Sequence, residues 1–153
     1  ESIVVFTDGR ERDCGMIREA ASMALRDGKR LIVLVVGNEI FETTHAALLG
    51  VSDEPAYRWP LLIRRFFVEN ILRQCRRHQL PVRPEIAYIG GNLHEQVHAL
   101  RHYQPHLLAS RVNASGELNA TVGHLIMAFV AADPTTRVLV MDSDTPARAS
   151  GPR

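Results

Sequence analysis

The sequence predicts an α/β fold, a single doubly wound three-layer sandwich whose five parallel strands lie in the order 3-2-1-4-5. One observation is that short runs of β-branched and aliphatic residues alternate with longer segments of helical periodicity. That alternation is typical of parallel strands joined by crossover helices. The other observation is the run 31–36 (LIVLVV), which is apolar at every position. A strand of this kind is covered by helices on both faces.

The first third of the chain contains two strands and the helix between them. Ser2–Phe6 (SIVVF) is a buried strand, and the turn sequence TDG ends it. Met16–Arg26 carries apolar residues at helical spacing, and Gly28 is placed to terminate that helix. Leu31–Val36 is then the second strand.

The remaining elements follow a weakly patterned segment, 37–60, which contains Gly50, Pro55 and Pro60 and is expected to be a variable insertion. After it, helices and strands alternate, and they are Leu61–Gln79, Glu85–Ile89, Leu93–Tyr103, Leu107–Ser110, Leu118–Ala132 and Arg137–Met141. Residues 142–153 are rich in Ser, Pro, Ala and Arg and are expected to form a flexible tail. The sequence therefore predicts one domain over residues 1–141.

Composition excludes several classes of protein. The 153 residues carry 18 basic and 17 acidic side chains, a net charge of +1, so global charge gives no support for a nucleic-acid partner. Uncharged apolar runs such as 31–36 are far too short to cross a membrane, so direct membrane insertion is not expected. We expect a cytoplasmic location.

Three segments resemble the universal stress protein domain family, and together they cover nearly the whole chain. They are Ile3–Gly9 (IVVFTDG), Ile86–Leu100 (IAYIGGNLHEQVHAL), and Leu107–Met141 with its strand, loop, long helix and closing strand. The resemblance implies the same strand order, that of the adenine nucleotide alpha hydrolase-like fold. It also implies a nucleotide site beyond the carboxyl ends of the strands.

The phosphate-binding loop of this family departs from its pattern here. Nucleotide-binding members have glycine, two residues, glycine, nine residues, and then Gly-Ser or Gly-Thr. Those glycines let backbone N–H groups approach the phosphates. In this chain the positions fall on Ala109, Val112 and Gly123-His124, with one residue of extra spacing. The sequence therefore predicts that binding of ATP or AMP is weakened or lost.

The resemblance still implies where a nucleotide would lie. Its base is expected near Thr7, Asp8 and Val36. Its phosphates are expected near a second group, which consists of Ser110, Arg111, Asn113, Gly123 and His124. Arg111 could compensate for the missing glycines by pairing with a phosphate directly.

The function that the resemblance implies is a non-catalytic sensing or regulatory domain. It would act as a homodimer, and it could also bind an adenine nucleotide or another anion weakly. The expected dimer contact is the apolar edge strand, Val138, Leu139, Val140 and Met141. Because the chain opens at Glu1 instead of methionine, the alternative is a cytosolic regulatory domain of a membrane transporter or sensor kinase. Its partner would then be its own membrane domain or another protein.

An enzyme is the less favoured hypothesis, as a metal-dependent hydrolase or a weak ATPase. His94-Glu95-Gln96-Val97-His98 matches HExxH, in which two histidines bind zinc and the glutamate activates water. The match falls on a short crossover helix whose expected buried stripe is Leu93, Val97 and Leu100, so coincidence is the preferred interpretation. We therefore assign no catalytic residue and no metal, with His94 and His98 as weak metal candidates.

Histidines recur at every fourth position from His94, through His98 and His102, to His106. As a set they could bind a transition metal or make the local charge respond to pH. A solvated helix face that happens to contain histidines is the preferred interpretation.

Overall fold

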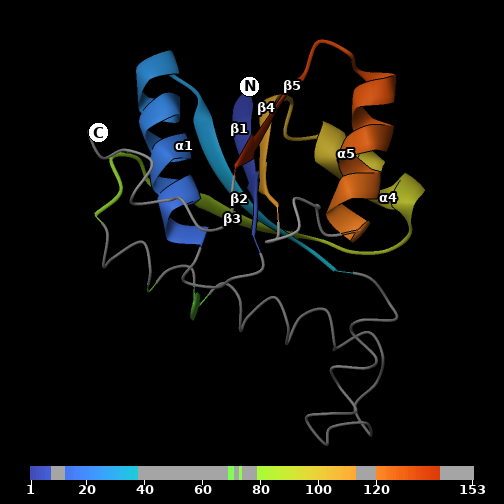
Figure 1. The fold of residues 1–153 in the computed structure, drawn as a ribbon, viewed down its shortest axis with the longest axis horizontal. Helices are drawn as coiled ribbons and strands as arrows, with labels where there is room; N and C mark the ends of the chain where they lie inside the picture. Colours follow the sequence, from blue (N-terminus) through green and yellow to red (C-terminus); the bar gives the residue numbers. More distant parts are fainter. Residues whose placement is uncertain (8–12, 38–68, 71–72, 74–78, 113–119, 142–153) are drawn as a thin grey trace, which may run out of the picture.

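The computed structural model describes residues 1–7, 13–37, 69–70, 73, 79–112 and 120–141, and in them the chain forms one parallel sheet (Figure 1). The strand order is β3-β2-β1-β4-β5. The strands are β1 Ser2–Phe6, β2 Arg30–Val36, β3 Glu85–Ile89, β4 Pro105–Arg111 and β5 Arg137–Met141. The predicted fold class and strand order are confirmed.

Helices cover both faces of this sheet. The described helices are α1 Cys14–Asp27, α4 Leu93–Arg101 and α5 Ala120–Ala132. Figure 1 shows α1 on one side of the strands and α4 and α5 on the other. Of the predicted helix over 61–79, residues 69, 70 and 73 are helical, and 61–68 lie outside the described residues. The predicted insertion, apart from Gly37, and the predicted tail also lie outside them.

The core has two halves, one on each face, because successive side chains of a strand point to opposite faces. Ile3 and Val5 of β1 pack against the apolar side of α1, and Val4 and Phe6 pack toward α4 and α5. All four are at most 3% exposed. The central strands are thus buried on both faces, as the run LIVLVV predicts.

Two helix ends show how local backbone geometry sets the boundaries. Gly28 takes the left-handed conformation with φ 64°, which glycine adopts without strain, and so terminates α1 as predicted. The prediction that the next helix continues from Leu93 to Tyr103 was wrong by two residues. The chain turns instead at Gln104, whose N–H bonds the carbonyl of Arg101 at 3.0 Å and whose φ is 49°.

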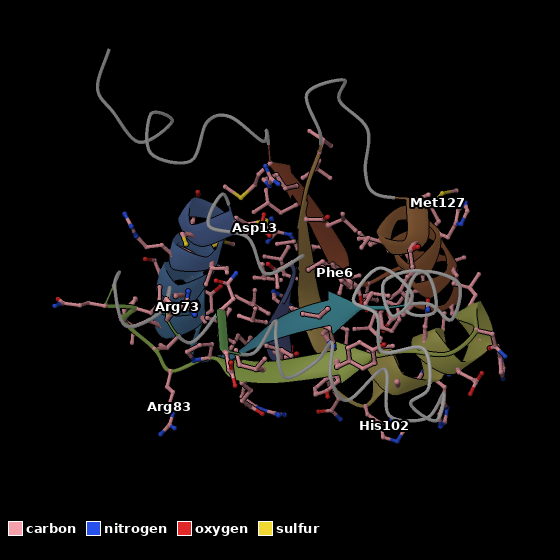
Figure 2. The ribbon with its side chains drawn as sticks, turned by 90° about the horizontal axis from the view of Figure 1, so that it is seen from below. Phe6, Asp13, Arg73, Arg83, His102 and Met127 are labelled. Carbon is pink, nitrogen blue, oxygen red and sulfur yellow. The ribbon has the colours of Figure 1, made fainter. Side chains whose placement is uncertain are left out.

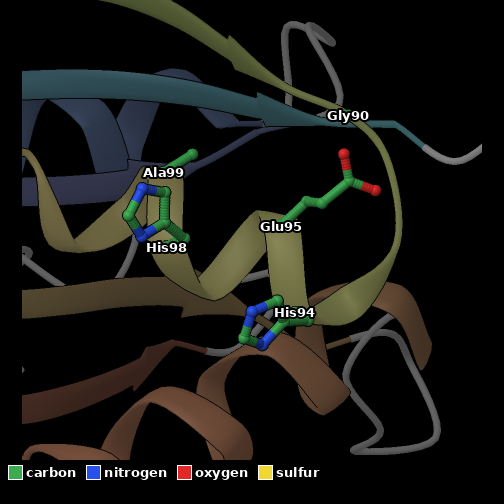
Figure 3. A pocket seen from close by; sticks show the side chains of 5 residues that line it. All are labelled: Gly90, His94, Glu95, His98 and Ala99. Atoms are coloured by element: carbon green, nitrogen blue, oxygen red, sulfur yellow. The ribbon is translucent and has the colours of Figure 1, made fainter.

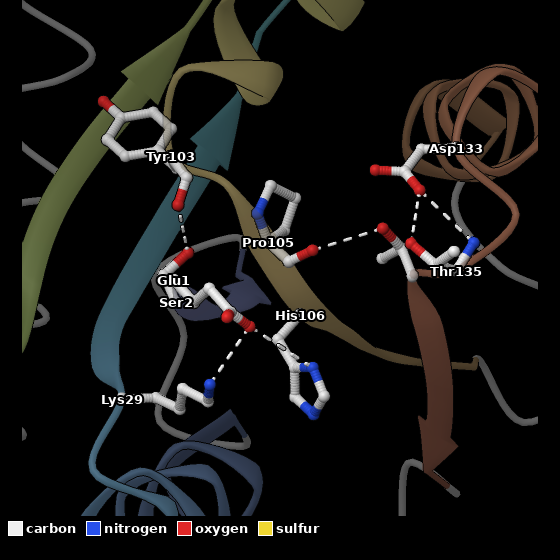
Figure 4. Close-up of polar contacts among 9 residues, drawn as sticks. Glu1, Ser2, Lys29, Tyr103, Pro105, His106, Asp133 and Thr135 are labelled. Atoms are coloured by element: carbon white, nitrogen blue, oxygen red, sulfur yellow. Dashed lines mark hydrogen bonds and ion pairs between the residues drawn. The ribbon is translucent and has the colours of Figure 1, made fainter.

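Side chains at the amino ends of the strands fasten the sheet at the edge opposite the carboxyl ends (Figure 4). The Ser2 hydroxyl donates to the carbonyl of Tyr103 at 2.7 Å, and the Thr136 hydroxyl donates to the carbonyl of Pro105 at 3.2 Å. Arg30 donates two hydrogen bonds to the Glu85 carboxylate, at 2.6 and 2.7 Å, and these lower the pKa of Glu85 from its usual value. These contacts join neighbouring strands outside the apolar core.

Among the described residues, no helix is both long enough and apolar enough to cross a membrane.

Truncation of Phe129 tests the core between α5 and the sheet. Phe129 is 1% exposed, and we expect Phe129→Ala to lower the free energy of unfolding by about 3–5 kcal/mol, because it leaves a cavity. The matched control is Met127→Ala on the same helix, where the side chain is 72% exposed, with an expected change within about 0.5 kcal/mol. Urea denaturation measures both. Equal losses for the two variants would contradict the assigned packing of α5.

Candidate functional site

The strand order reverses between β1 and β4, and this is where an α/β sheet forms a crevice beyond the carboxyl ends of its strands. From β1 the chain continues to β2 and β3 on one side, and β4 and β5 lie on the other. Ligands bind at such a switch point in open α/β sheets. Thr7 follows the end of β1, and Arg111 is the last residue of β4, so both lie at this edge.

A buried polar cluster of Thr7, Asp13 and Arg111 occupies this position. The Thr7 hydroxyl donates to Oδ2 of Asp13 at 2.6 Å, and Nε of Arg111 donates to Oδ1 of Asp13 at 2.8 Å. The side chains of Arg111 and Asp13 are only 9% and 4% exposed. One carboxylate therefore bridges the carboxyl ends of the two strands on either side of the switch point.

The cluster forms because three elements present these side chains to one face of the sheet. Val5 and Ala109 belong to the core under α1, so alternation places Thr7 and Arg111 on the same face, two residues further along β1 and β4. Asp13 directly precedes α1, yet its side chain does not cap that helix. Its carboxylate turns to the strands instead.

The nucleotide-binding residues expected from the resemblance are distributed over both faces of this edge. Ser110 is 5% exposed, and alternation directs its side chain away from Arg111, toward the face of α4 and α5. Gly123 and His124 lie within α5 on that second face, with His124 exposed. Val36 ends β2 and packs against the apolar core of the same face.

Two more of the expected residues, Asp8 and Asn113, lie outside the described residues. The structure therefore brings together Thr7 and Arg111, through Asp13, and shows no contact of either with Gly123 or His124 among the described residues.

Asp13 is the site residue that sequence reasoning missed. It lies in the segment TDGRERD, where Asp8 drew attention because it follows the first strand. The signal that could have found Asp13 is its place shortly before the predicted helix, where aspartate is common at the N-cap position. Its actual partner, Arg111, is 98 positions away in the chain.

A second feature is a hollow of about 490 Å³ beside the start of α4, lined by Gly90, His94, Glu95, His98 and Ala99 (Figure 3). It contains all three residues of the HExxH match. Glu95, however, accepts a hydrogen bond from the backbone N–H of Asn92 at 3.1 Å, and Asn92 accepts one from the N–H of Glu95 at 2.9 Å. This capping box holds the start of α4.

The HExxH residues do not form a metal centre within the described part of the chain. No group of three or more His, Cys, Asp or Glu side chains there could hold a metal ion. The Glu95 carboxylate also lies close to Gly91, where an added Cβ would meet it at 3.1 Å. The role of Glu95 is therefore structural in this geometry.

The four-residue recurrence of histidines does not form one helix face. The rings of His98 and His102 contact edge to face at 4.9 Å, and Nδ1 of His102 lies 3.1 Å from the carbonyl of His98. Because α4 ends at Arg101, His106 falls in β4, where its Nδ1 lies 3.7 Å from the Glu1 carboxylate (Figure 4). His106 therefore lies in a strand, apart from the helix that carries His94 and His98. Both interpretations of the four histidines, the preferred solvated helix face and the metal- or pH-sensitive set, were wrong for His106.

Gln96 is a second residue that the sequence pattern did not single out. It is 3% exposed, and its amide donates to the carbonyls of Gly37 at 3.2 Å and Gly91 at 3.0 Å. It thereby ties together the residues that follow β2 and β3 at the carboxyl edge. Leu93, which was expected in the buried stripe, is instead 42% exposed.

Comparisons with known proteins place this geometry in a recognised fold. No protein-family model matches the chain, and no curated protein matches it in sequence. Solved structures do match. A universal stress protein in complex with cAMP is 18% identical, with a TM-score of 0.50 over 94% of this chain and 98% of that chain.

Two further universal stress proteins are similar. The one from Archaeoglobus fulgidus is 14% identical with a TM-score of 0.54, over 91% of this chain and 96% of that chain. The one from Burkholderia pseudomallei is 17% identical with a TM-score of 0.52, over 95% and 96%. The fold that the resemblance predicted is confirmed: the chain has the fold of the universal stress proteins.

Replacement of Arg111 tests the buried cluster. We expect Arg111→Gln to lower the free energy of unfolding by about 3–5 kcal/mol, because it removes the guanidinium that neutralises a buried carboxylate. Arg137→Gln, at the exposed start of β5, is the matched control and should change stability little. Chemical denaturation of the two variants provides the comparison. A loss no larger for Arg111→Gln than for the control would show that the pair does not contribute to the fold.

Proposed function

We propose that this chain, which has the universal stress protein fold, is a regulatory domain that binds an adenine nucleotide at the carboxyl edge of its sheet and acts as a homodimer. The observation that carries the proposal is the position of Thr7 and Arg111. A hydroxyl and a guanidinium converge there at the point where the strand order reverses. These are groups that bind phosphate oxygens.

In the proposed pose the phosphate lies against the Thr7 hydroxyl and the Arg111 guanidinium, and the base lies toward Asp8 and Val36. The phosphate contacts that the resemblance implied at Ser110, Asn113, Gly123 and His124 stay a prediction. The support for the pose is the fold, together with the solved complex of a similar protein with cAMP. A nucleotide with a single phosphate group is the ligand that we expect at the cluster, since the Arg111 guanidinium can pair with one anionic group in a bidentate way.

The surroundings of Ala109 and Val112, two positions that depart from the glycine pattern, support binding of phosphate by side chains. Ala109 is 1% exposed in the core under α1, and the backbone N–H of Val112 donates to the carbonyl of Met141 at 2.9 Å. That N–H is therefore engaged between β4 and β5. The Arg111 side chain is then the principal phosphate donor in the proposed mode.

Dimerisation is proposed through β5. This strand lies at the edge of the sheet, and Val138 and Val140 are 40% and 47% exposed on it. Leu139 and Met141 point the other way and pack against the core under α1. Pairing with β5 of a second copy would cover both valines and satisfy the backbone groups of the edge.

Nucleotide binding is tested by calorimetric titration with AMP, ATP and cAMP. We expect wild-type protein to bind at least one of them, and Asp8→Ala to weaken that binding about tenfold or more, because a charged hydrogen bond to the ligand is lost. Asp27→Ala, at the far end of α1, is the matched control and should leave affinity unchanged. Absence of heat with wild type at millimolar ligand would overturn the proposal.

The dimer is tested by measuring mass in solution. We expect wild type to sediment as a dimer and Val140→Lys to shift it toward monomer, because a lysine ammonium cannot be buried in the apolar contact without a partner. Leu25→Lys changes a residue that is 60% exposed on α1 and should leave the dimer intact. A monomeric wild type, or equal behaviour of the two variants, would contradict this interface.

A further inference from the structure

The Asp13 carboxylate is held by two hydrogen-bond donors at the carboxyl edge of the sheet. Its Oδ2 accepts from the Thr7 hydroxyl at 2.6 Å, and its Oδ1 accepts from Nε of Arg111 at 2.8 Å. Two donors, one directly after β1 and one at the end of β4, thus converge on one carboxylate, and both are groups that also bind phosphate oxygens. The exposed fraction of the Asp13 side chain is 4%, so this anion is enclosed by protein.

We propose that Asp13 is a built-in competitor that holds Arg111 and Thr7 until a phosphate-bearing ligand displaces its carboxylate. The inference rests on the proposed function, since it describes the regulation of the same site. Its ligand class is a phosphate monoester or diester, whose oxygens accept the same two donors. In the absence of ligand, Asp13 neutralises Arg111 and keeps the cluster closed.

Electrostatics explains why the two anions exclude each other. A carboxylate and a phosphate held by the same guanidinium would be like charges within a few ångströms, in surroundings where water screens poorly. Binding of ligand therefore requires that the Asp13 carboxylate leave Arg111. The contact lowers the affinity for phosphate and sets the concentration at which the site responds.

Because Asp13 directly precedes α1, displacement of its carboxylate by a ligand would affect the start of that helix. Asp13 is followed directly by Cys14, the first residue of α1, and Figure 2 shows it beside that helix. Exchange of its carboxylate for a ligand phosphate changes the contacts that join the start of α1 to β1 and β4. The state of the site is thereby transmitted to α1.

The test uses Asp13→Asn in the full chain, because the amide has the shape of the carboxylate without its charge. We compare thermal midpoints in sodium phosphate and in sodium chloride of equal ionic strength. We expect phosphate to raise the midpoint of Asp13→Asn by about 3 °C or more relative to chloride, because the anion restores neutrality around Arg111. Wild type and Asp27→Asn, a matched acid-to-amide change at the other end of α1, should show only the smaller general effect of phosphate.

The double variant Asp13→Asn/Arg111→Gln identifies the partner of the anion. We expect it to lose the additional phosphate effect, because the guanidinium is gone. A phosphate effect on Asp13→Asn equal to that on wild type, or retained in the double variant, would overturn the proposal. If Asp13→Asn does not fold in chloride, refolding is the readout: recovery in phosphate supports the proposal, and no recovery in either salt overturns it.

Titration with cAMP separates this proposal from the proposed function. We expect Asp13→Asn to bind cAMP about tenfold more tightly than wild type, since the internal competitor is removed. Equal, measurable affinities of the two proteins for cAMP would overturn the role of Asp13 as a competitor and would leave the proposed nucleotide binding intact. Stabilisation of Asp13→Asn by phosphate, with no cAMP binding to either protein, would support the competitor and overturn nucleotide binding.

Discussion

Burial of both faces of the central strands is the constraint on which the rest of this structure depends. β1, β2 and β4 carry apolar side chains on each face, and these cannot be shielded unless helices lie on both sides. Crossover helices make the strands parallel, so all carboxyl ends meet at one edge. Polar residues that follow β1 and β4 are therefore brought together, although the chain separates them by about a hundred residues.

The buried pair of Asp13 and Arg111 is possible only because of this arrangement. Two charges withdrawn from water are tolerated when each finds its partner at close range, and the geometry here adds the Thr7 hydroxyl to the same carboxylate. Such a cluster gains little net stability over an apolar one of equal volume. It also makes the start of α1 dependent on the ends of two strands.

The sequence predicted the fold well because its signals are local. Apolar runs mark β1, β3 and β5 with the bounds that the structure has, and Gly28 marks the end of α1 through its left-handed backbone. The site was harder to predict. The residue that completes it, Asp13, has no local signal of its partner, and the pairing with Arg111 is a property of the assembled sheet.

Other differences from prediction also arise from the folded context. Glu95 matches the glutamate of the HExxH metal-binding motif, yet its side chain forms a capping box with Asn92. Gln96 is buried where the predicted apolar stripe had Leu93. Its amide donates hydrogen bonds to two backbone carbonyls that follow strands β2 and β3. His106 does not lie on the same helix as His94 and His98, because α4 ends at Arg101 and the chain turns at Gln104. Each outcome depends on hydrogen-bond partners that a periodicity pattern does not contain.

The Nε–H signal of Arg111 in a nuclear magnetic resonance titration reports directly whether ligand binds at the carboxyl edge of the sheet. That hydrogen is donated to Asp13 in the ligand-free protein, so its resonance reports the acceptor that it faces. If ligand binds at the Arg111 edge, addition of cAMP shifts the Arg111 signal and leaves the signal of Arg137, at the amino end of β5, unchanged. Binding of cAMP with no change at Arg111 would contradict a site at this edge.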